Sequence, residues 1–290
     1  MIPDRCLDAL VPHLEGTVQS QEAVQGGCIA NASRLVTTAE RYFVKWSDGA
    51  AAQTFEAEAA GLEALAAADA PLVIPEVVAV QGPTSDAPGF LVLEWIPTES
   101  ARSDVWERFG TGLAQLHRHA TDQYGFGRDN FIGRLPQPNP WHTSWPAFFR
   151  AARLEPQVQR ARDAGRWLAA WNDPLDRLYR RLPDLLPAEP PASVVHGDLW
   201  KGNFMITEKS TPVLIDPAAY YGHREVDLAM TELFGGFSAP FYAAYRSAWP
   251  LPSGYGRRKT VYNLYHLINH LNHFGSGYAD AVGASLAEFA

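Results

Sequence analysis

Hydrophobic and polar residues alternate over two short stretches near the start of the chain, and this pattern predicts a β-hairpin. The two strands are expected over residues 34–38 and 42–46, where β-branched and aromatic side chains are frequent, with a turn at 39–41. Because side chains alternate between the two faces of a strand, Phe43 and Lys45 are expected to share one face. The opposite face is expected to carry Tyr42, Val44 and Trp46.

A helix and two further strands are expected to complete the first third of the chain. The run over residues 57–70 is rich in Ala, Glu and Leu, which favour a helix, and Pro71 stops it. Strands are predicted over residues 76–81 and 90–96, with prolines and a glycine between them. This part is therefore expected to be rich in strands with one prominent helix.

Further along the chain the pattern changes to apolar residues at helical intervals. Asn172-Asp173-Pro174 is typical of a helix that restarts with proline in its first turn, whereas the proline-rich stretch 131–145 indicates a loop. Short strands are expected over residues 193–196, 204–207 and 213–216. The apolar stripes that predict helices are Val105, Phe109, Leu113 and Leu116; Trp167, Trp171, Leu175, Leu178 and Leu182; and Val261, Leu264, Tyr265, Ile268 and Leu271.

A small strand-rich part followed by a larger helical part predicts an α+β protein with two lobes. We expect an N-terminal lobe with an antiparallel sheet over residues 1–96. A mainly helical C-terminal lobe is expected over residues 97–290. The cleft between the lobes would lie near residues 94–98.

Composition narrows the class of protein. The 290 residues suit two packed lobes, and the net charge of −8 disfavours nucleic-acid binding because an acidic chain repels phosphate backbones. Cys6 and Cys28 are the only cysteines, which excludes a disulfide framework and fits a reducing compartment. The N-terminus carries acidic residues rather than a secretory signal, and no run of about 18 apolar residues predicts a membrane helix. The expected location is cytoplasmic.

The segment HGDLWKGN carries the strongest chemical signal. A predicted strand leads into a His-Gly-Asp triplet ending at Asp198, Asn203 follows five residues later, and a second predicted strand ends at Asp216. In phosphoryl transfer the attacking hydroxyl needs a carboxylate that orients it and accepts its proton, and Asp198 suits that task. Mg²⁺ prefers oxygen ligands, which Asn203 and Asp216 provide. An isolated His-Gly-Asp is more often a simple turn, but the three residues at these spacings favour a catalytic site.

The same motif resembles the catalytic and metal-binding loops of the aminoglycoside phosphotransferase and protein-kinase-like superfamily. Four longer strings resemble the fructosamine kinase (ketosamine-3-kinase) family: HGDLWKGN, IDPAAYYGHREVDLAMTELFGGF, FYAAY and LYHLINHLNHFGSGY. The resemblance implies a bilobal protein-kinase-like fold that phosphorylates the C3 hydroxyl of ketosamines, with ATP and Mg²⁺. The implied substrate is a small-molecule ketosamine or glycated amine of the fructosamine or ribulosamine type, and the implied role is deglycation or metabolite repair.

The resemblance also assigns roles to residues of the first lobe. Lys45 is expected to hold the ATP phosphates from the second strand of the hairpin. A lysine facing the cleft needs an acidic partner, and the next helix offers Glu56, Glu58 and Glu63. Glu58 is favoured because, with Leu62 four residues on, it matches the helix pattern of the family, and Glu56 is the second choice.

Two backbone sites are expected to complete the nucleotide pocket. Gly26 and Gly27 lie ahead of the first strand of the hairpin, where glycine permits close approach of the backbone to phosphates. Glu94, Trp95 and Ile96 are expected to form the hinge between the lobes, whose backbone would bind adenine. The alternatives are an ordinary turn for the glycines and an internal strand for the hinge.

In the second lobe, Asp227 resembles the structural aspartate of the superfamily and is expected, with His196, to brace the catalytic loop. Trp200 and His223 are expected to contact the sugar, since an aromatic face suits a sugar ring, and a core position is the alternative. Lys201 is expected to touch a phosphate or substrate, or to point to water. Three further histidines lie on one predicted helix face without the cysteines or carboxylates that would support a metal site: His266, His270 and His273.

The chain also departs from protein kinases. After Asp216 there is no Phe-Gly and no Ala-Pro-Glu segment, so the activation loop of protein kinases is missing, which argues against protein substrates. Two alternatives stay open: another small-molecule kinase that acts on aminoglycosides or choline, and a nucleotide-binding pseudokinase that acts as a regulator. The intact set of Lys45, Asp198, Asn203 and Asp216 argues against the second. No pattern in the sequence indicates the preferred ketosamine or the oligomeric state.

Overall fold

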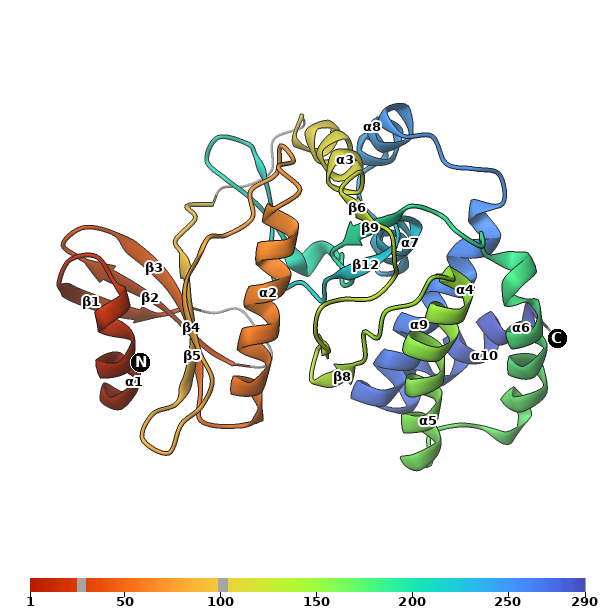
Figure 1. Cartoon of the computed structure of the whole chain (residues 1–290), viewed down its shortest axis with the longest axis horizontal. Coiled ribbons are helices and arrows are strands. Elements are labelled where there is room, and N and C mark those ends of the chain that lie inside the picture. The colour runs from red at the N-terminus through yellow and green to blue at the C-terminus, as the bar shows by residue number, and fades with distance from the viewer. Residues whose placement is uncertain (25–29, 99–103, 290) are drawn as a thin grey trace.

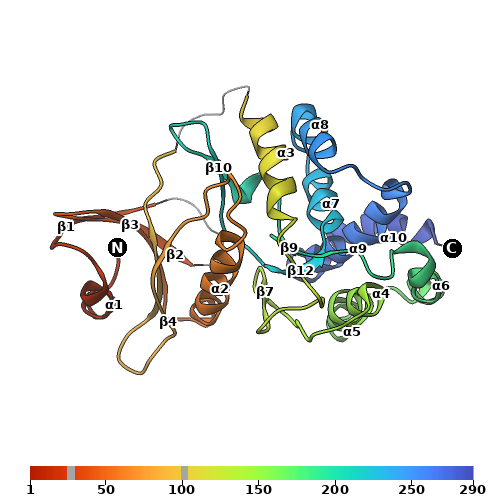
Figure 2. The same cartoon turned by 45° about the horizontal axis from the view of Figure 1, so that its top comes forward.

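The computed structural model describes residues 1–24, 30–98 and 104–289, which form two lobes (Figure 1). The N-terminal lobe is built on an antiparallel sheet and the C-terminal lobe is mainly helical, so the predicted α+β, bilobal plan is confirmed. In a second view, helix α2 (Phe55–Ala66) lies on the side of the N-terminal lobe that faces the C-terminal lobe (Figure 2). Gly26, Gly27 and Cys28 lie outside the described residues.

Five strands in the order β1-β2-β3-β5-β4 form the N-terminal sheet, and every neighbouring pair is antiparallel. The predicted hairpin is confirmed, because β2 and β3 pair with Leu35 opposite Tyr42. The strands are β1 Val18–Ala23, β2 Asn31–Thr37, β3 Arg41–Ser47, β4 Val77–Gln81 and β5 Gly89–Glu94.

The two faces of this sheet pack against different helices. Val44 packs with Cys6 and Leu10 of helix α1 (Asp4–Leu10), on the face away from the C-terminal lobe. Phe43 packs with the cluster that α2 forms on the other face. The predicted alternation along β3 is therefore confirmed, and it directs Lys45 to the α2 side.

The C-terminal lobe packs its helices around α7 and α9, and its largest core cluster also includes strands β9 and β12. A π-helical turn, Phe149–Leu154, joins α4 to α5. The helices are α3 Val105–Leu116, α4 Trp145–Phe148, α5 Glu155–Asp163, α6 Asn172–Leu185, α7 Glu225–Leu233, α8 Ala239–Ala248, α9 Tyr255–Phe274 and α10 Ala279–Ala287.

Short strands within this lobe lead into the loops that line the cleft. β12 and β6 flank β9 in one sheet, while β10 and β11 form a hairpin. Val73 bridges to Val213, so the N-terminal lobe is also joined to that hairpin. In the described part of the chain, no helix has the length and apolar character needed to cross a membrane. The strands are β6 Ala120–Thr121, β7 Asn130–Ile132, β8 Leu135–Gln137, β9 Ala192–Val195, β10 Phe204–Ile206, β11 Pro212–Leu214 and β12 Tyr220–His223.

Two sequence predictions need correction. The helix expected over residues 57–70 ends at Ala66, and the chain then turns through Asp69, whose φ is +47°. The stretch 131–145, expected to be a loop, contains most of the β7–β8 hairpin, which begins at residue 130. By contrast, the helix restart expected at Asn172-Asp173-Pro174 is confirmed, because α6 begins at Asn172.

Candidate active site

The loop that follows β9 depends on a glycine. Gly197 has a φ of +80°, in the left-handed region, and a Cβ at this position would overlap the carbonyl oxygen of Ala218. The turn at Gly197 directs the next residue, Asp198, into the cleft. The short 3₁₀ helix Lys201–Asn203 then leads into β10.

Asp227 holds this loop from the side of the core. Its carboxylate accepts the backbone N–H groups of His196 (2.7 Å) and Gly197 (2.9 Å), and a third hydrogen bond from Nε2 of His117 (3.1 Å). Burial raises the pKa of Asp227, but the hydrogen bonds from His117 and from the backbone N–H of Gly197 outweigh burial, so the pKa lies below its usual value. His196 itself is fixed through Nε2, which donates to the Ile215 carbonyl (2.9 Å). These are the contacts that a brace of the loop requires.

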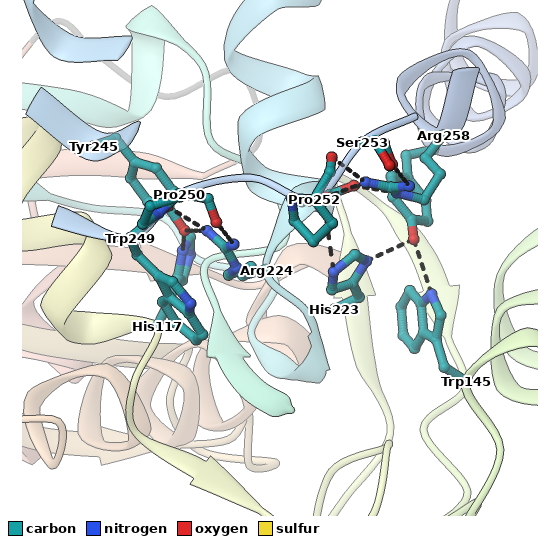
Figure 3. Close-up of polar contacts among 12 residues, drawn as sticks. His117, Trp145, His223, Arg224, Tyr245, Trp249, Pro250, Pro252, Ser253 and Arg258 are labelled. Atoms are coloured by element: carbon teal, nitrogen blue, oxygen red, sulfur yellow. Dashed lines mark hydrogen bonds and ion pairs between the residues drawn. The ribbon is translucent and has the colours of Figure 1, made fainter. Parts of the chain in front are cut away.

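A further layer of side chains supports His117. The Tyr245 hydroxyl donates to Nδ1 of His117 (2.8 Å), and Arg224 donates to the Tyr245 oxygen (3.1 Å) and to the carbonyl of Trp249 (3.1 Å) (Figure 3). Arg224 is therefore joined to Asp227 through two intervening side chains.

Asp198 and Asn203 lie together at the cleft surface. The Nδ2 group of Asn203 donates to the backbone carbonyl of Asp198 (2.8 Å) and to its carboxylate (3.2 Å). Burial raises the pKa of Asp198 to about 7, against the hydrogen bond from Asn203, and the carboxylates of Asp216 and Asp227 add to the rise. A carboxylate with a pKa near neutrality is suited to accept a proton from a substrate hydroxyl.

Asp216 follows strand β11 and lies across the β10–β11 hairpin from Asn203. The backbone N–H of Ile215 donates to the Asn203 carbonyl (3.2 Å), and that of Ala218 donates to the His196 carbonyl (2.9 Å). Asp216 itself has a φ of +54°, which a residue with a side chain seldom adopts. The two flanking hydrogen bonds hold this conformation and keep Asp216 beside Asn203.

Buried amides fix the segment after Asp216 from below. Asn130 donates to the carbonyl of Ala219 (2.8 Å), and Gln137 donates to that of Ala218 (3.1 Å) and to Asn130 (2.8 Å). The Tyr265 hydroxyl donates to Gln137 (2.5 Å). Asn130 and Gln137 are 3% and 1% exposed, so these carbonyls are held without help from water.

Lys45 reaches the same place from the N-terminal lobe. Its Nζ lies 2.7 Å from Glu58 and 2.5 Å from Asp216. Burial lowers the pKa of Lys45, but the two carboxylates outweigh it and raise the pKa, so the ammonium group stays charged. Glu56 points elsewhere and pairs with Arg128 (3.1 Å), because residues two apart on a helix face different directions.

These groups line one cavity of about 330 Å³ between the lobes. Trp200 is 41% exposed and forms part of its wall. Residues from the β7–β8 hairpin close another side. The chemically relevant lining residues are Lys45, Glu58, Phe131, Gly133, Asp198, Trp200, Asn203 and Asp216.

His223 does not reach the cavity, and the expected sugar contact is corrected. His223 is 4% exposed, lies near Trp145 and hydrogen-bonds through Nδ1 to the Tyr262 hydroxyl (2.7 Å) (Figure 3). The register of β12 explains its position: Tyr220 lies opposite Val195, so His223 lies at the far end of the strand pair, about 10 Å from the catalytic loop.

Other predicted residues also lie apart from the cavity. Glu94, Trp95 and Ile96 are not among its lining residues, and the N–H of Trp95 already donates to the Arg41 carbonyl (3.2 Å). No group of three metal-ligating side chains occurs among the described residues, the three histidines of α9 included.

The structure adds functional residues that sequence reasoning missed. His117, Asn130 and Gln137 are buried polar residues whose partners are more than 80 residues away or belong to the β7–β8 hairpin. The only feature of the local sequence that could indicate a buried supporting role for these residues is that they are polar. That signal does not distinguish them from surface residues.

The fold and the site together define a small-molecule kinase with a protein-kinase-like fold. At 16% identity, the choline kinase of Streptococcus pneumoniae shares the fold with a TM-score of 0.61, covering 97% of each chain. The family model for fructosamine kinase matches residues 9–289. The chain therefore belongs to the fructosamine kinase family.

Relatives within the family are similar over nearly the whole chain. The probable ketoamine kinase of Synechocystis sp. is 45% identical over 262 residues, covering 90% of this chain and 87% of that protein. The ketosamine-3-kinase of Mus musculus is 35% identical over 286 residues, covering 87% and 89%. A crystal structure of a "putative fructosamine-3-kinase" from Thermobifida fusca has a TM-score of 0.86 at 29% identity, covering 99% of each chain.

Proposed function

We propose that this chain phosphorylates the C3 hydroxyl of ketosamines with ATP as the donor, and so acts in deglycation or metabolite repair. The observation that carries the proposal is the convergence of Lys45, Asp198, Asn203 and Asp216 on one cavity from both lobes. Membership in the fructosamine kinase family supports the choice of substrate class.

Asp198 is the proposed base. It would hold the substrate hydroxyl and accept its proton as the oxygen forms a bond to the γ-phosphorus of ATP. The bond between that phosphorus and the bridging oxygen breaks, ADP leaves with the electron pair, and the sugar carries the phosphate. Trp200 offers an exposed ring beside Asp198 on which the sugar can stack. His196 and Asp227 would keep the loop rigid during the transfer.

Lys45, held in place by Glu58, would anchor the ATP phosphates. The ammonium group is held by Glu58, and its second partner in this structure, Asp216, is a carboxylate that a metal can take over. Gly26 and Gly27 remain proposed nucleotide contacts through their backbone. Glu94, Trp95 and Ile96 also remain proposed hinge contacts, although they lie outside the cavity lining in this structure.

The donor set of Asn203 and Asp216 fits Mg²⁺. Because Nδ2 of Asn203 is engaged with Asp198, its Oδ1 is the atom available for a cation, and Asp216 adds carboxylate oxygens. When bound there, Mg²⁺ neutralises phosphate charge. The chain's own residues orient the hydroxyl and receive its proton.

The test is a substrate panel analysed by mass spectrometry. Purified protein with MgATP is offered a fructosamine, a ribulosamine, an aminoglycoside and choline. The proposal predicts a phosphate adduct on the ketosamines and the release of free amine, because the phosphorylated product is unstable. Transfer to the aminoglycoside or choline alone would favour the other small-molecule kinases. Tight nucleotide binding without any transfer would favour a pseudokinase.

A further inference from the structure

Four aromatic residues beside the cleft form a continuous wall, which we name the aromatic wall: Phe234, His270, Phe274 and Tyr278. Phe234 stacks on His270 with ring centroids 4.5 Å apart and an angle of 7°. His270 contacts Phe274 (5.3 Å) and Tyr278 (5.0 Å) edge to face. Phe274 is 68% exposed although it belongs to this cluster.

The end of α9 explains how the wall is assembled. His270 and Phe274 are four residues apart, so they lie on one face of the helix. Gly275 ends the helix with a φ of +85°, and the following turn, Ser276–Tyr278, folds Tyr278 back onto His270. The fold thus positions an exposed ring on a rigid base.

The wall lies next to the lining of the catalytic cavity at two points, through residues that neighbour lining residues. His273, whose ring lies 5.6 Å from that of Phe274, accepts the backbone N–H of Arg134 (3.1 Å). A Cβ on the cavity-lining Gly133 would be 2.7 Å from this imidazole, so His273 lies directly behind the cavity wall. At the other point, Lys201 donates to the carbonyl of Gly235 (3.5 Å), the residue after Phe234.

The wall is also uncharged near neutral pH. Burial, followed by the neighbouring His273, lowers the pKa of His270 to about 4, so His270 is a neutral ring. Neutral aromatic faces attract alkyl and aromatic groups, and they attract cations next to such groups through cation–π contacts. An amine that bears an apolar substituent combines both features.

We propose that the aromatic wall is the subsite for the nitrogen substituent of the ketosamine, and that it prefers an aromatic or long apolar substituent. This inference rests on the proposed function. In a ketosamine the nitrogen is attached to C1, three bonds from C3, so a C3 hydroxyl at Asp198 leaves the substituent to extend out of the cavity. The wall is the apolar surface that adjoins the cavity there.

The experiment compares two fructosamines, made from benzylamine and from methylamine, with wild type and Phe274→Ser. Wild type is expected to have a KM for the benzylamine adduct about five- to tenfold lower, as one aromatic contact would provide. Phe274→Ser is expected to remove most of this preference while kcat and KM for the methylamine adduct stay within about twofold. Phe234→Ser is the second variant. Leu168→Ser is the matched control, because Leu168 is 52% exposed and lies outside the cavity lining.

The outcomes separate the subsite from the reaction itself. Phosphorylation of both adducts without a preference, or an equal change for both adducts in Phe274→Ser, would overturn the subsite while leaving the kinase intact. If neither adduct is phosphorylated by wild type, the proposed function and the subsite both fail. A loss of preference in Leu168→Ser would also contradict the assignment.

Discussion

Asn203 donates from one amide group to both the backbone carbonyl and the carboxylate of Asp198, at 2.8 and 3.2 Å. The residue proposed to offer its remaining oxygen to Mg²⁺ therefore also fixes the orientation of the proposed base. Under the proposed function, metal binding and proton transfer would be coupled through this single side chain.

Replacement of Asn203 should affect both tasks. Asn203→Ala removes the hydrogen bonds to Asp198 and one oxygen ligand, and we expect kcat to fall by about 10²- to 10³-fold. The measurement is steady-state kcat at saturating MgATP over a range of Mg²⁺ concentrations, with a thermal melt as the control for folding. A folded Asn203→Ala protein with kcat close to that of wild type would contradict the coupling.

The pH dependence should report Asp198. Its pKa of about 7 reflects burial first and neighbouring carboxylates second, and only the ionised form can accept a proton. We therefore expect kcat/KM to rise with pH through the near-neutral range and then level off; bound Mg²⁺ moves this limb toward lower pH because a cation favours the carboxylate. A profile that is flat from about pH 5 to 8, in protein that remains folded, would rule out Asp198 as a titrating base.

Loss of Lys45 should weaken the use of ATP. Lys45→Met removes the cation that lies between Glu58 and Asp216 and leaves both carboxylates facing the phosphates without a counter-charge. We expect KM for ATP to rise by about 10- to 100-fold, with a fall in kcat. Glu56→Gln is the matched control, because Glu56 is an exposed helix residue paired with Arg128 and should keep wild-type kinetics. Equal effects of the two substitutions would contradict the role of Lys45.

Asp227 should matter for stability as well as for rate. Asp227→Asn replaces one acceptor oxygen by a donor that faces the N–H groups of His196 and Gly197, and we expect the free energy of unfolding to fall by about 2–4 kcal/mol. The pKa of Asp227 is below its ordinary value of 3.8, so its contribution is present above that value and is lost as pH falls through the lower native pKa. Urea titrations at neutral and acidic pH should show a smaller acid destabilisation from this site in the variant. Unchanged stability at neutral pH would show that the brace contributes nothing.

Local patterns in the sequence predicted those parts of the fold that depend on local chemistry. The β2–β3 hairpin and the direction of Lys45 follow from alternation, and the three short strands near the catalytic loop follow from β-branched runs. Strand β1 was not predicted, because its sequence VQSQEA is polar on both faces and it lies at the sheet edge. Strands β7 and β8 are not predicted, because each has only three residues and β8 contains Pro136.

The metal and catalytic residues of the candidate site were predictable because residues that are close in the sequence are also close in space there. Asp198, Asn203 and Asp216 are joined by one hairpin, so their spacing fixes their geometry. His223 is also close to Asp216 in the sequence, but the antiparallel register of β12 with β9 places it at the end of the strand pair that is far from the catalytic loop. The amide support from Gln137 depends on contacts across 81 residues, and no local pattern encodes such a contact.

The most direct test of the central claim is pre-steady-state phosphoryl transfer by wild type and Asp198→Asn at saturating MgATP and ketosamine. Nucleotide affinity is measured in parallel by calorimetry. We predict that Asp198→Asn lowers the transfer rate by about 10³-fold or more while nucleotide affinity stays close to that of wild type. A folded Asp198→Asn protein that transfers phosphate at a rate within about tenfold of wild type would contradict the assignment of Asp198 as the base.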